Sequence, residues 1–418
     1  MNKTNKTLVV GIPPEYNYPG RIEEWSKNNT RYAANFGASF IAQSVLRQYD
    51  GEFGWDLDNP EKYRGSYDQI VIALATHIHP SRDIWKITRF VEALELPTHF
   101  ISGGISDYET SVSSGVHPSV RRLLEIASQD GRYIGVRGHY TAHYLHKTGF
   151  QNAVPTGCPS IYYNCKPELH IERISNPRKI RCPYHLTVGR QVPEFFTQTD
   201  IVGQDFEDQA IFTDDLASDD TLQEWVRAQF PTVAAWETMN KAIKEKGIFP
   251  TSYNDWFEII GSSDAVIGPR LHGCLAALVQ GIPTVMTPRD LRGREVAEFY
   301  EIPSAGYHEV ADRGVQEILK SSSFEKFETT YSARYKNYLA FLRENKTHSR
   351  HNHEGENVEY VPAINRRDEI VIDSLILHRQ SAVSLKKKPA APLVATKDNS
   401  IRGLIRQILK GLARRIKN

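Results

Sequence analysis

Short apolar runs alternate with longer amphipathic stretches along most of this 418-residue chain. A short apolar run is typical of a buried strand, and an amphipathic stretch of 10 to 15 residues is typical of a helix that covers a sheet. Strands and helices that alternate in this way form βαβ units, whose strands join a parallel sheet. The pattern therefore predicts an α/β fold. Strands are predicted at residues 8–12, 69–75, 98–102, 133–136, 185–189, 210–213, 265–267 and 284–286, and helices at 33–49, 84–94, 118–127, 221–229, 253–260, 271–279 and 324–344.

A polar stretch at residues 164–179, which holds Pro167 and Pro177, interrupts this alternation. Such a stretch is typical of a hinge, because prolines interrupt strands and helices. At about 100 to 200 residues per domain, the length also leaves room for two domains. We therefore expect two Rossmann-like domains, at residues 1–165 and 180–345, that face each other across a cleft. Ligands of open parallel sheets bind at the carboxyl ends of the strands.

The composition changes after the last predicted helix. Residues 346–400 are interpreted as a polar tail and linker, in which the His-rich stretch 348–353 is expected to be a solvated loop rather than a metal site. Residues 401–418 place apolar side chains on one helical face and six basic ones on the other, with no acidic residue. This pattern predicts a basic amphipathic helix on an anionic membrane surface. A helix docked on the protein's own body or on a partner is the alternative.

Charge and hydropathy exclude several classes of function. Lys and Arg total 51 against 50 Asp and Glu, so the chain lacks the basic excess of a nucleic-acid-binding protein. The whole chain carries +1 and residues 401–418 carry +6, so residues 1–400 carry −5. No stretch reaches the 18 apolar residues of a membrane span, and the start lacks the apolar region of a signal peptide. We expect a cytoplasmic protein, with peripheral attachment to the inner face of the membrane through residues 401–418 as an option.

The four cysteines are too widely spaced for a zinc ribbon or a disulfide framework, so we expect reduced thiols.

The most informative segment begins at the predicted strand 265–267. After this strand Gly268-Pro269 forms a turn, and Arg270 and His272 stand where the next helix begins. A helix N-terminus at the carboxyl edge of a parallel sheet binds anions through free backbone N–H groups. A guanidinium adds a planar fork for carboxylate or phosphate, and an imidazole can transfer a proton near neutral pH. The alternative is an Arg that holds a turn and a His that caps a helix.

A similar arrangement occurs in the first half of the chain. The predicted strand 133–136 leads into Arg137-Gly138 and then into a helix that we expect to end near Gly149. Arg137 and Arg270, one from each half, would converge on one small molecule with several negative charges. Neither segment carries the glycine pattern of a P-loop or of a dinucleotide-binding turn.

These residues resemble the polysaccharide pyruvyl transferase family over about residues 8 to 310. The resemblance rests on Ile134-Gly-Val-Arg-Gly138 with Thr141, Leu145 and Gly149, on Val154-Pro-Thr-Gly-Cys-Pro159, and above all on Val266-Ile-Gly-Pro-Arg-Leu-His-Gly273 with Gly281-Ile-Pro283. It implies two Rossmann-like domains of the GT-B type, and an enzyme that moves the pyruvyl group of phosphoenolpyruvate onto two hydroxyls of a sugar as a cyclic ketal.

By this resemblance Arg137, Arg270, Leu271 and His272 bind the donor, and His272 is the catalytic residue. We expect an acceptor sugar that belongs to a polysaccharide or lipid-linked oligosaccharide, a role in exopolysaccharide or other cell-surface polysaccharide biosynthesis, and no cofactor or metal besides phosphoenolpyruvate as co-substrate. A GT-B glycosyltransferase that uses a nucleotide sugar and a non-catalytic binding protein of the same fold are the alternatives.

The sequence departs from the family at two places. Asn35-Phe-Gly-Ala38 lacks the aspartate of the family's Asn-x-Gly-Asp, and Gly157-Cys-Pro159 stands where Gly-Asp-Pro is usual. The acceptor side is therefore predicted only weakly, from Asn35, Tyr16 and Tyr18.

Two further charged segments are compatible with either a site or an ordinary surface. Asp56-Leu-Asp58 matches a metal-binding D-x-D, although a loop is the expected interpretation. Arg292 or Arg294 would lie near the cleft, or would be ordinary surface charges of a helix.

Overall fold

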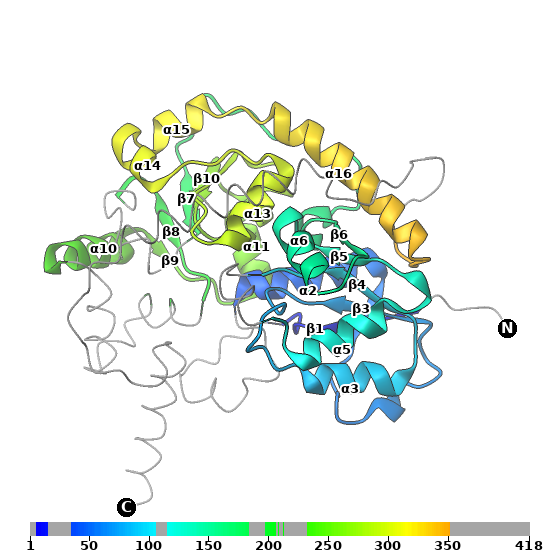
Figure 1. The fold of residues 1–418 in the computed structure, drawn as a ribbon. Helices are drawn as coiled ribbons and strands as arrows, with labels where there is room; N and C mark the ends of the chain where they lie inside the picture. Colours follow the sequence, from blue (N-terminus) through cyan, green and yellow to red (C-terminus); the bar gives the residue numbers. More distant parts are fainter. Residues whose placement is uncertain are drawn as a thin grey trace, which may run out of the picture. The chain divides into compact units, whose positions relative to one another are not determined.

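The computed structural model describes residues 6–15, 35–105, 115–183, 197–205, 208, 212 and 232–351, all of which belong to one compact unit (Figure 1). The predicted strands at 185–189 and 210–213 and the helix at 221–229 lie outside the described residues, Phe212 excepted. So do Tyr16, Tyr18 and the basic amphipathic segment 401–418.

The first half contains a parallel four-stranded sheet of order β2-β1-β3-β4. Its strands are β1 (Thr7–Gly11), β2 (Gly51–Phe53), β3 (Gln69–Ala73) and β4 (Thr98–Ser102). The parallel pair β5 (Ile134–Val136) and β6 (Ala153–Pro155) continues it through a bridge between Gly103 and Val136. Every residue of β3 and β4 is buried, as expected for parallel strands covered on both faces.

The second half contains a parallel five-stranded sheet of order β11-β10-β7-β8-β9. Its strands are β7 (Ile180–Pro183), β8 (Asp200–Val202), β9 (Gly247–Ile248), β10 (Ala265–Gly268) and β11 (Thr284–Met286). These two sheets confirm the prediction of an α/β fold with Rossmann-like halves.

Helices connect most of the strands. The first half has α2 (Phe36–Tyr49), α3 (Trp85–Leu94), α5 (Pro118–Ala127) and α6 (His139–Lys147), with the 3₁₀ turns η1 (Pro60–Lys62), η2 (Gln129–Gly131) and η3 (Pro159–Tyr162). The second half has α10 (Val233–Lys246), α11 (Tyr253–Gly261), α12 (Leu271–Leu278), α13 (Leu291–Tyr300), α14 (Tyr307–Arg313), α15 (Val315–Ser321) and α16 (Glu325–Glu344). None of the helices described is long and apolar enough to span a membrane.

One hydrophobic core joins the two halves. Phe36 and Phe40 of α2 lie against Trp256 of α11, each with ring centroids 6.0 Å apart, and the Phe36 ring stacks on the indole. The core cluster also includes most of α12, whose eight residues are all buried. Burial of these large rings stabilises the packing of α2 of the first half against the second half. The division into domains at residues 165 and 180 stays a prediction, and residues 164–179 contain neither helix nor strand.

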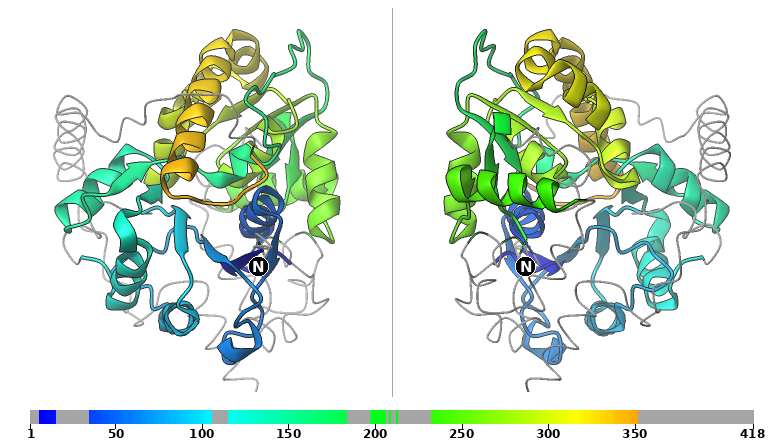
Figure 2. Two further views of the ribbon diagram at one scale, coloured as in Figure 1. Left: turned by 90° about the vertical axis from the view of Figure 1, so that its right-hand side faces the viewer. Right: turned by 90° about the vertical axis from the view of Figure 1, so that its left-hand side faces the viewer.

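Helix α16 crosses from the second half back to the first (Figure 2). Tyr338 of α16 stacks on Tyr162 with ring centroids 4.4 Å apart, and its hydroxyl lies 2.6 Å from the hydroxyl of Tyr49. Asn345, just after α16, exchanges two side-chain hydrogen bonds with the backbone of Tyr133, of 2.8 and 2.9 Å.

The interpretation of the His-rich stretch as a solvated loop is wrong for His351. Its side chain is buried, Nδ1 lies 2.8 Å from the Tyr335 hydroxyl, and Nε2 lies 3.2 Å from Oε1 of Gln48. The neighbouring His348 backbone pairs with the Gln69 side chain. Residues 346–351, expected to begin a polar tail, therefore pack against α2, β3 and α16.

Candidate functional site

The predicted donor-binding residues follow two parallel strands. Arg137 comes directly after β5 and before α6, and Arg270 comes directly after β10 and is the N-cap of α12. His272 is the second residue of α12. The structure brings them together, because the positive charges of Arg137 and Arg270 both act on the His272 imidazole.

Arg137 is the most unusual residue of the site. Its side chain is 0% exposed, and none of its three guanidinium nitrogens has a hydrogen-bond partner among the described residues. Burial lowers its pKa, against the opposing influence of Cys158, Glu295 and Asp290. A buried cation without hydrogen bonds is costly, and native proteins seldom keep one unless it has a function. The arrangement therefore points to an anionic ligand.

The N-terminus of α6, beside Arg137, is occupied by a carboxylate of the protein itself. Oε1 of Glu295 accepts a hydrogen bond of 2.6 Å from the Thr141 backbone N–H, and Oε2 accepts one of 2.8 Å from the Thr141 hydroxyl. This contact requires a glycine at position 138, because a Cβ there would lie only 2.5 Å from Cγ of Glu295. Burial raises the pKa of Glu295 to about 7, although the Thr141 hydrogen bonds and Arg137 oppose the rise. Sequence reasoning missed Glu295, which carries no local motif.

His272 is buried, with Nε2 lying 3.8 Å from the sulfur of Cys158. Burial, followed by the positive charges of Arg137, Arg292 and Arg270, holds its pKa well below the usual range. This shift favours the neutral form of the imidazole. An anionic ligand would offset these positive charges and so raise the pKa of His272.

Arg270 is already paired within the protein. Its guanidinium forms an ion pair with Asp205 and lies 3.5 Å from Asp208. Burial raises the pKa of Asp208 to about 7, in opposition to the Arg270 charge. Neither aspartate could be recognised from the sequence, since both follow β8, a short strand that the apolar pattern does not predict. Leu271, the other predicted donor-binding residue, packs into the hydrophobic core.

Helix α13 adds a second group of charges to the site. Asp290 caps its N-terminus by accepting a 3.0 Å hydrogen bond from Gly293 N–H, and it also accepts one of 3.1 Å from Nη2 of Arg292. Burial would raise the pKa of Asp290, but Arg292, Gly293 N–H and Arg289 outweigh it and lower the pKa. Of the two arginines singled out in the sequence, Arg292 is the one near the site, because its charge acts on both Arg137 and His272.

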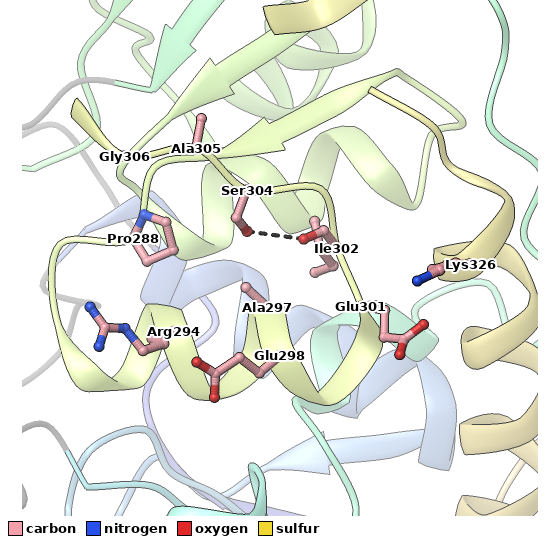
Figure 3. Close-up of a pocket in the computed structure, with 10 residues that line it drawn as sticks. All are labelled: Pro288, Arg294, Ala297, Glu298, Glu301, Ile302, Ser304, Ala305, Gly306 and Lys326. Atoms are coloured by element: carbon pink, nitrogen blue, oxygen red, sulfur yellow. Dashed lines mark hydrogen bonds between the residues drawn. The ribbon is translucent and has the colours of Figure 1, made fainter. Parts of the chain in front are cut away.

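Arg294 lies on another side of α13. There it lines an open pocket of about 560 Å³ together with Pro288, Ala297, Glu298, Glu301, Ile302, Ser304, Ala305, Gly306 and Lys326 (Figure 3). Of the residues predicted to bind donor or acceptor, none of those that the structure describes lines this pocket.

Asn35, the described member of the predicted acceptor side, is the N-cap of α2. Its Oδ1 accepts a 2.8 Å hydrogen bond from Ala38 N–H. Asn35 lies close to the donor residues, because a Cβ on Gly37 would be 2.8 Å from Cβ of His272 and 3.3 Å from Oδ1 of Asn35. Its role toward an acceptor stays a prediction.

Both aspartates of the D-x-D segment, Asp56 and Asp58, are paired with other side chains of the protein. Asp56 forms an ion pair with Lys62 and hydrogen bonds with Asn59, and Asp58 forms an ion pair of 2.7 Å with Lys86. Within the described part of the chain no three His, Cys, Asp or Glu side chains gather as a metal site.

Comparison with solved structures finds distant similarity. The UDP-GlcNAc 2-epimerase of Methanocaldococcus jannaschii is 9% identical with a TM-score of 0.39, over 81% of this chain and 99% of that one. The UDP-bound MnaA protein of S. aureus is 10% identical with a TM-score of 0.40, over 81% of this chain and 97% of that one. The E. coli heptosyltransferase WaaC is 10% identical with a TM-score of 0.28, over 76% of this chain and 100% of that one. No curated protein matches the chain.

The comparison with protein families is decisive. The model of the polysaccharide pyruvyl transferases matches residues 16–290, which include Arg137, Arg270 and His272 and make up more than half of the sequence. The chain therefore belongs to the polysaccharide pyruvyl transferase family.

Proposed function

We propose that this protein transfers the pyruvyl group of phosphoenolpyruvate to two hydroxyls of a sugar, forming a cyclic ketal in the biosynthesis of exopolysaccharide or another cell-surface polysaccharide. The observation that carries the proposal is the Arg137 guanidinium, buried beside His272 and without a hydrogen-bond partner among the described residues. Phosphoenolpyruvate carries a carboxylate and a phosphate, both of which suit the planar fork of an arginine.

The proposed reaction needs one proton donor and a site for several negative charges. The methylene carbon of the donor gains a proton, one sugar hydroxyl attacks the central carbon, phosphate leaves, and the second hydroxyl attacks the same carbon. The two hydroxyl protons balance the proton taken up by the methylene group and the proton that leaves with phosphate. The protein's residues hold the anionic groups and move protons, without a cofactor.

His272 is the proposed proton donor, either to the methylene carbon or to the departing phosphate. Burial and the charges of three arginines hold its pKa well below the usual range, and an anionic donor that offsets these charges would favour its protonation. A positioned general acid contributes about 100- to 10,000-fold to the rate. Donor binding and activation of His272 are thus coupled, because the same negative charges that Arg137 binds favour the imidazolium.

The test is phosphate release from phosphoenolpyruvate across a panel of sugar acceptors. We expect release that depends on the acceptor and that falls by at least about 100-fold in His272→Ala. Nucleotide sugars are included as competing donors. Transfer from a nucleotide sugar, with no phosphate released from phosphoenolpyruvate, would overturn the proposal in favour of a glycosyltransferase.

The acceptor is proposed to be part of a polysaccharide or a lipid-linked oligosaccharide. A membrane-embedded acceptor fits the sequence of residues 401–418, whose six basic side chains and apolar face are typical of a helix on an anionic membrane surface. We propose a cytoplasmic protein that attaches to the inner face of the membrane through this segment.

A further inference from the structure

Arg292, at the start of α13, shares an unusual property with Arg137. Its side chain is 23% exposed, and its buried Nε has no hydrogen-bond partner in the part of the chain that the structure describes. Its Nη2 donates to Asp290 at 3.1 Å, which fixes the orientation of the guanidinium while Nε keeps no partner among the described residues. A guanidinium held in this way is preorganised for an anion.

The rest of α13 explains why Arg292 lies in the site. Glu295, one helical turn after Arg292, accepts both hydrogen bonds from Thr141 and so fastens α13 to the N-terminus of α6. That N-terminus begins directly after Arg137. The positive charge of Arg292 consequently acts on both Arg137 and His272.

Arg270 differs from these two arginines in its surroundings. Asp205 and Asp208 approach its guanidinium and neutralise it within the protein. Arg292 is paired with one carboxylate, Asp290, which Arg289 also contacts, and the Arg137 guanidinium has no hydrogen-bond partner among the described residues. An anion between Arg137 and Arg292 would therefore offset the repulsion between these two cations.

We propose that Arg292 is a second donor-binding arginine, which together with Arg137 binds the phosphate or carboxylate of the anionic donor, while Arg270 positions the start of α12. The proposal rests on the proposed function for the identity of the donor. Binding by the two arginines itself requires only a ligand with a phosphate or carboxylate group.

The test compares Arg292→Ala with Arg294→Ala, a matched control two residues further along the same helix that faces the open pocket of Figure 3. Binding of phosphoenolpyruvate and of inorganic phosphate is measured by calorimetry. Arg292→Ala should weaken binding of both anions by about 10- to 100-fold, the usual effect of losing a charged hydrogen-bonding group. Arg292→Lys should bind with intermediate affinity because it keeps the charge without the fork. Arg294→Ala should stay within about twofold of the parent.

The outcomes separate the inference from the proposed function. Unchanged affinity for phosphoenolpyruvate in Arg292→Ala, in a protein that unfolds at the parent's temperature, would overturn the role of Arg292 and leave the function intact. Phosphate binding that depends on Arg292, in a protein that releases no phosphate from phosphoenolpyruvate with any acceptor, would support Arg292 and overturn the function. A parent protein that binds neither anion would overturn both. Arg292→Gln, closer in shape, replaces Arg292→Ala if the latter fails to fold.

Discussion

The sulfur of Cys158 lies 3.8 Å from Nε2 of His272, and both side chains are buried. The thiol therefore contacts one of the two ring nitrogens of the proposed proton donor. A sulfur is a weak hydrogen-bonding group, so this contact orients the ring more than it changes its basicity.

For Cys158→Ala we accordingly expect a modest loss of turnover, less than about tenfold, against at least about 100-fold for His272→Ala. The measurement is phosphate release from phosphoenolpyruvate at saturating acceptor. Cys158→Ser is the matched control, since it keeps a small hydrogen-bonding group at the same place. If Cys158→Ala lost as much activity as His272→Ala, the thiol would itself take part in proton transfer, contrary to this expectation.

Binding of the donor should be accompanied by proton uptake at His272. Burial and three arginines lower the pKa of the ligand-free imidazole and favour its neutral form, and a bound anion reverses the electrostatic part of this effect. Near pH 7 we expect net proton uptake on donor binding in the parent protein, and a clearly smaller uptake in His272→Gln. Calorimetric titrations in two buffers of different ionisation enthalpy measure the number of protons.

Glu295 is the necessary control for that measurement, because its pKa of about 7 allows it to take up protons as well. Glu295→Gln removes this contribution while leaving that of His272. Equal proton uptake in the parent protein and His272→Gln would show that the imidazole keeps one protonation state through binding.

Replacing Arg137 by Met should stabilise the fold while removing donor binding. The guanidinium is fully buried and lacks hydrogen bonds to the residues that the structure describes, so the folded state bears the cost of desolvating a charge. Met fills a similar volume without this cost. At pH 6, where Glu295 is mostly protonated, we expect a higher melting temperature and at least about 100-fold weaker phosphoenolpyruvate binding. A lower melting temperature at that pH would mean that Arg137 is paired in the protein after all.

Much of the fold could be predicted because periodicity is a local property of the sequence. The expected strands at 8–12, 69–75 and 98–102 are confirmed by β1, β3 and β4 to within two residues. The same reasoning located Arg137 and Arg270, since the end of a strand and the start of a helix can both be recognised locally. By contrast, β7, β8 and β9 are only two to four residues long, and they contain too few consecutive apolar residues to be recognised as strands from the sequence.

The partners of the site residues could not be predicted for a related reason. Asp205 pairs with Arg270 and Glu295 with Thr141 across 65 and 154 positions of sequence, and each acid stands in an ordinary polar context. His351 was misjudged because its burial depends on Gln48 and Tyr335, which only the tertiary fold brings near. Pair contacts of this kind are decided by packing and have no local signature.

The buried carboxyl of Glu295 should make stability depend on pH. Its pKa is about 7 in the folded protein against a usual value of 4.5, so the folded state binds the proton more tightly than the unfolded state. This contribution to stability is complete below about pH 4.5 and is lost as pH rises through 7. At 1.36 kcal/mol per pKa unit, the free energy of unfolding should fall by on the order of 3 kcal/mol over this range.

Glu295→Gln should reduce this slope, and denaturant unfolding at pH 5 and pH 8 measures it. Asp208, with a pKa also raised to about 7, contributes a slope of the same sign, so Asp208→Asn serves as the parallel comparison and part of the slope should persist in each single variant. A slope unchanged in Glu295→Gln would contradict the buried-acid description of this residue.

The segment 401–418 should bind anionic membranes through charge and apolar contact together. Deleting residues 386–418 removes ten basic side chains and one acidic one, a net charge of +9, and leaves residues 1–385 with a net charge of −8. We expect the full chain to sediment with liposomes that contain anionic lipid, less so at high salt, and the truncated chain to stay in solution. Phosphoenolpyruvate affinity should be the same in both, because Arg137, Arg292 and His272 lie outside the deleted residues. Liposome binding that survives the deletion would show that the membrane contact, if any, lies elsewhere in the chain.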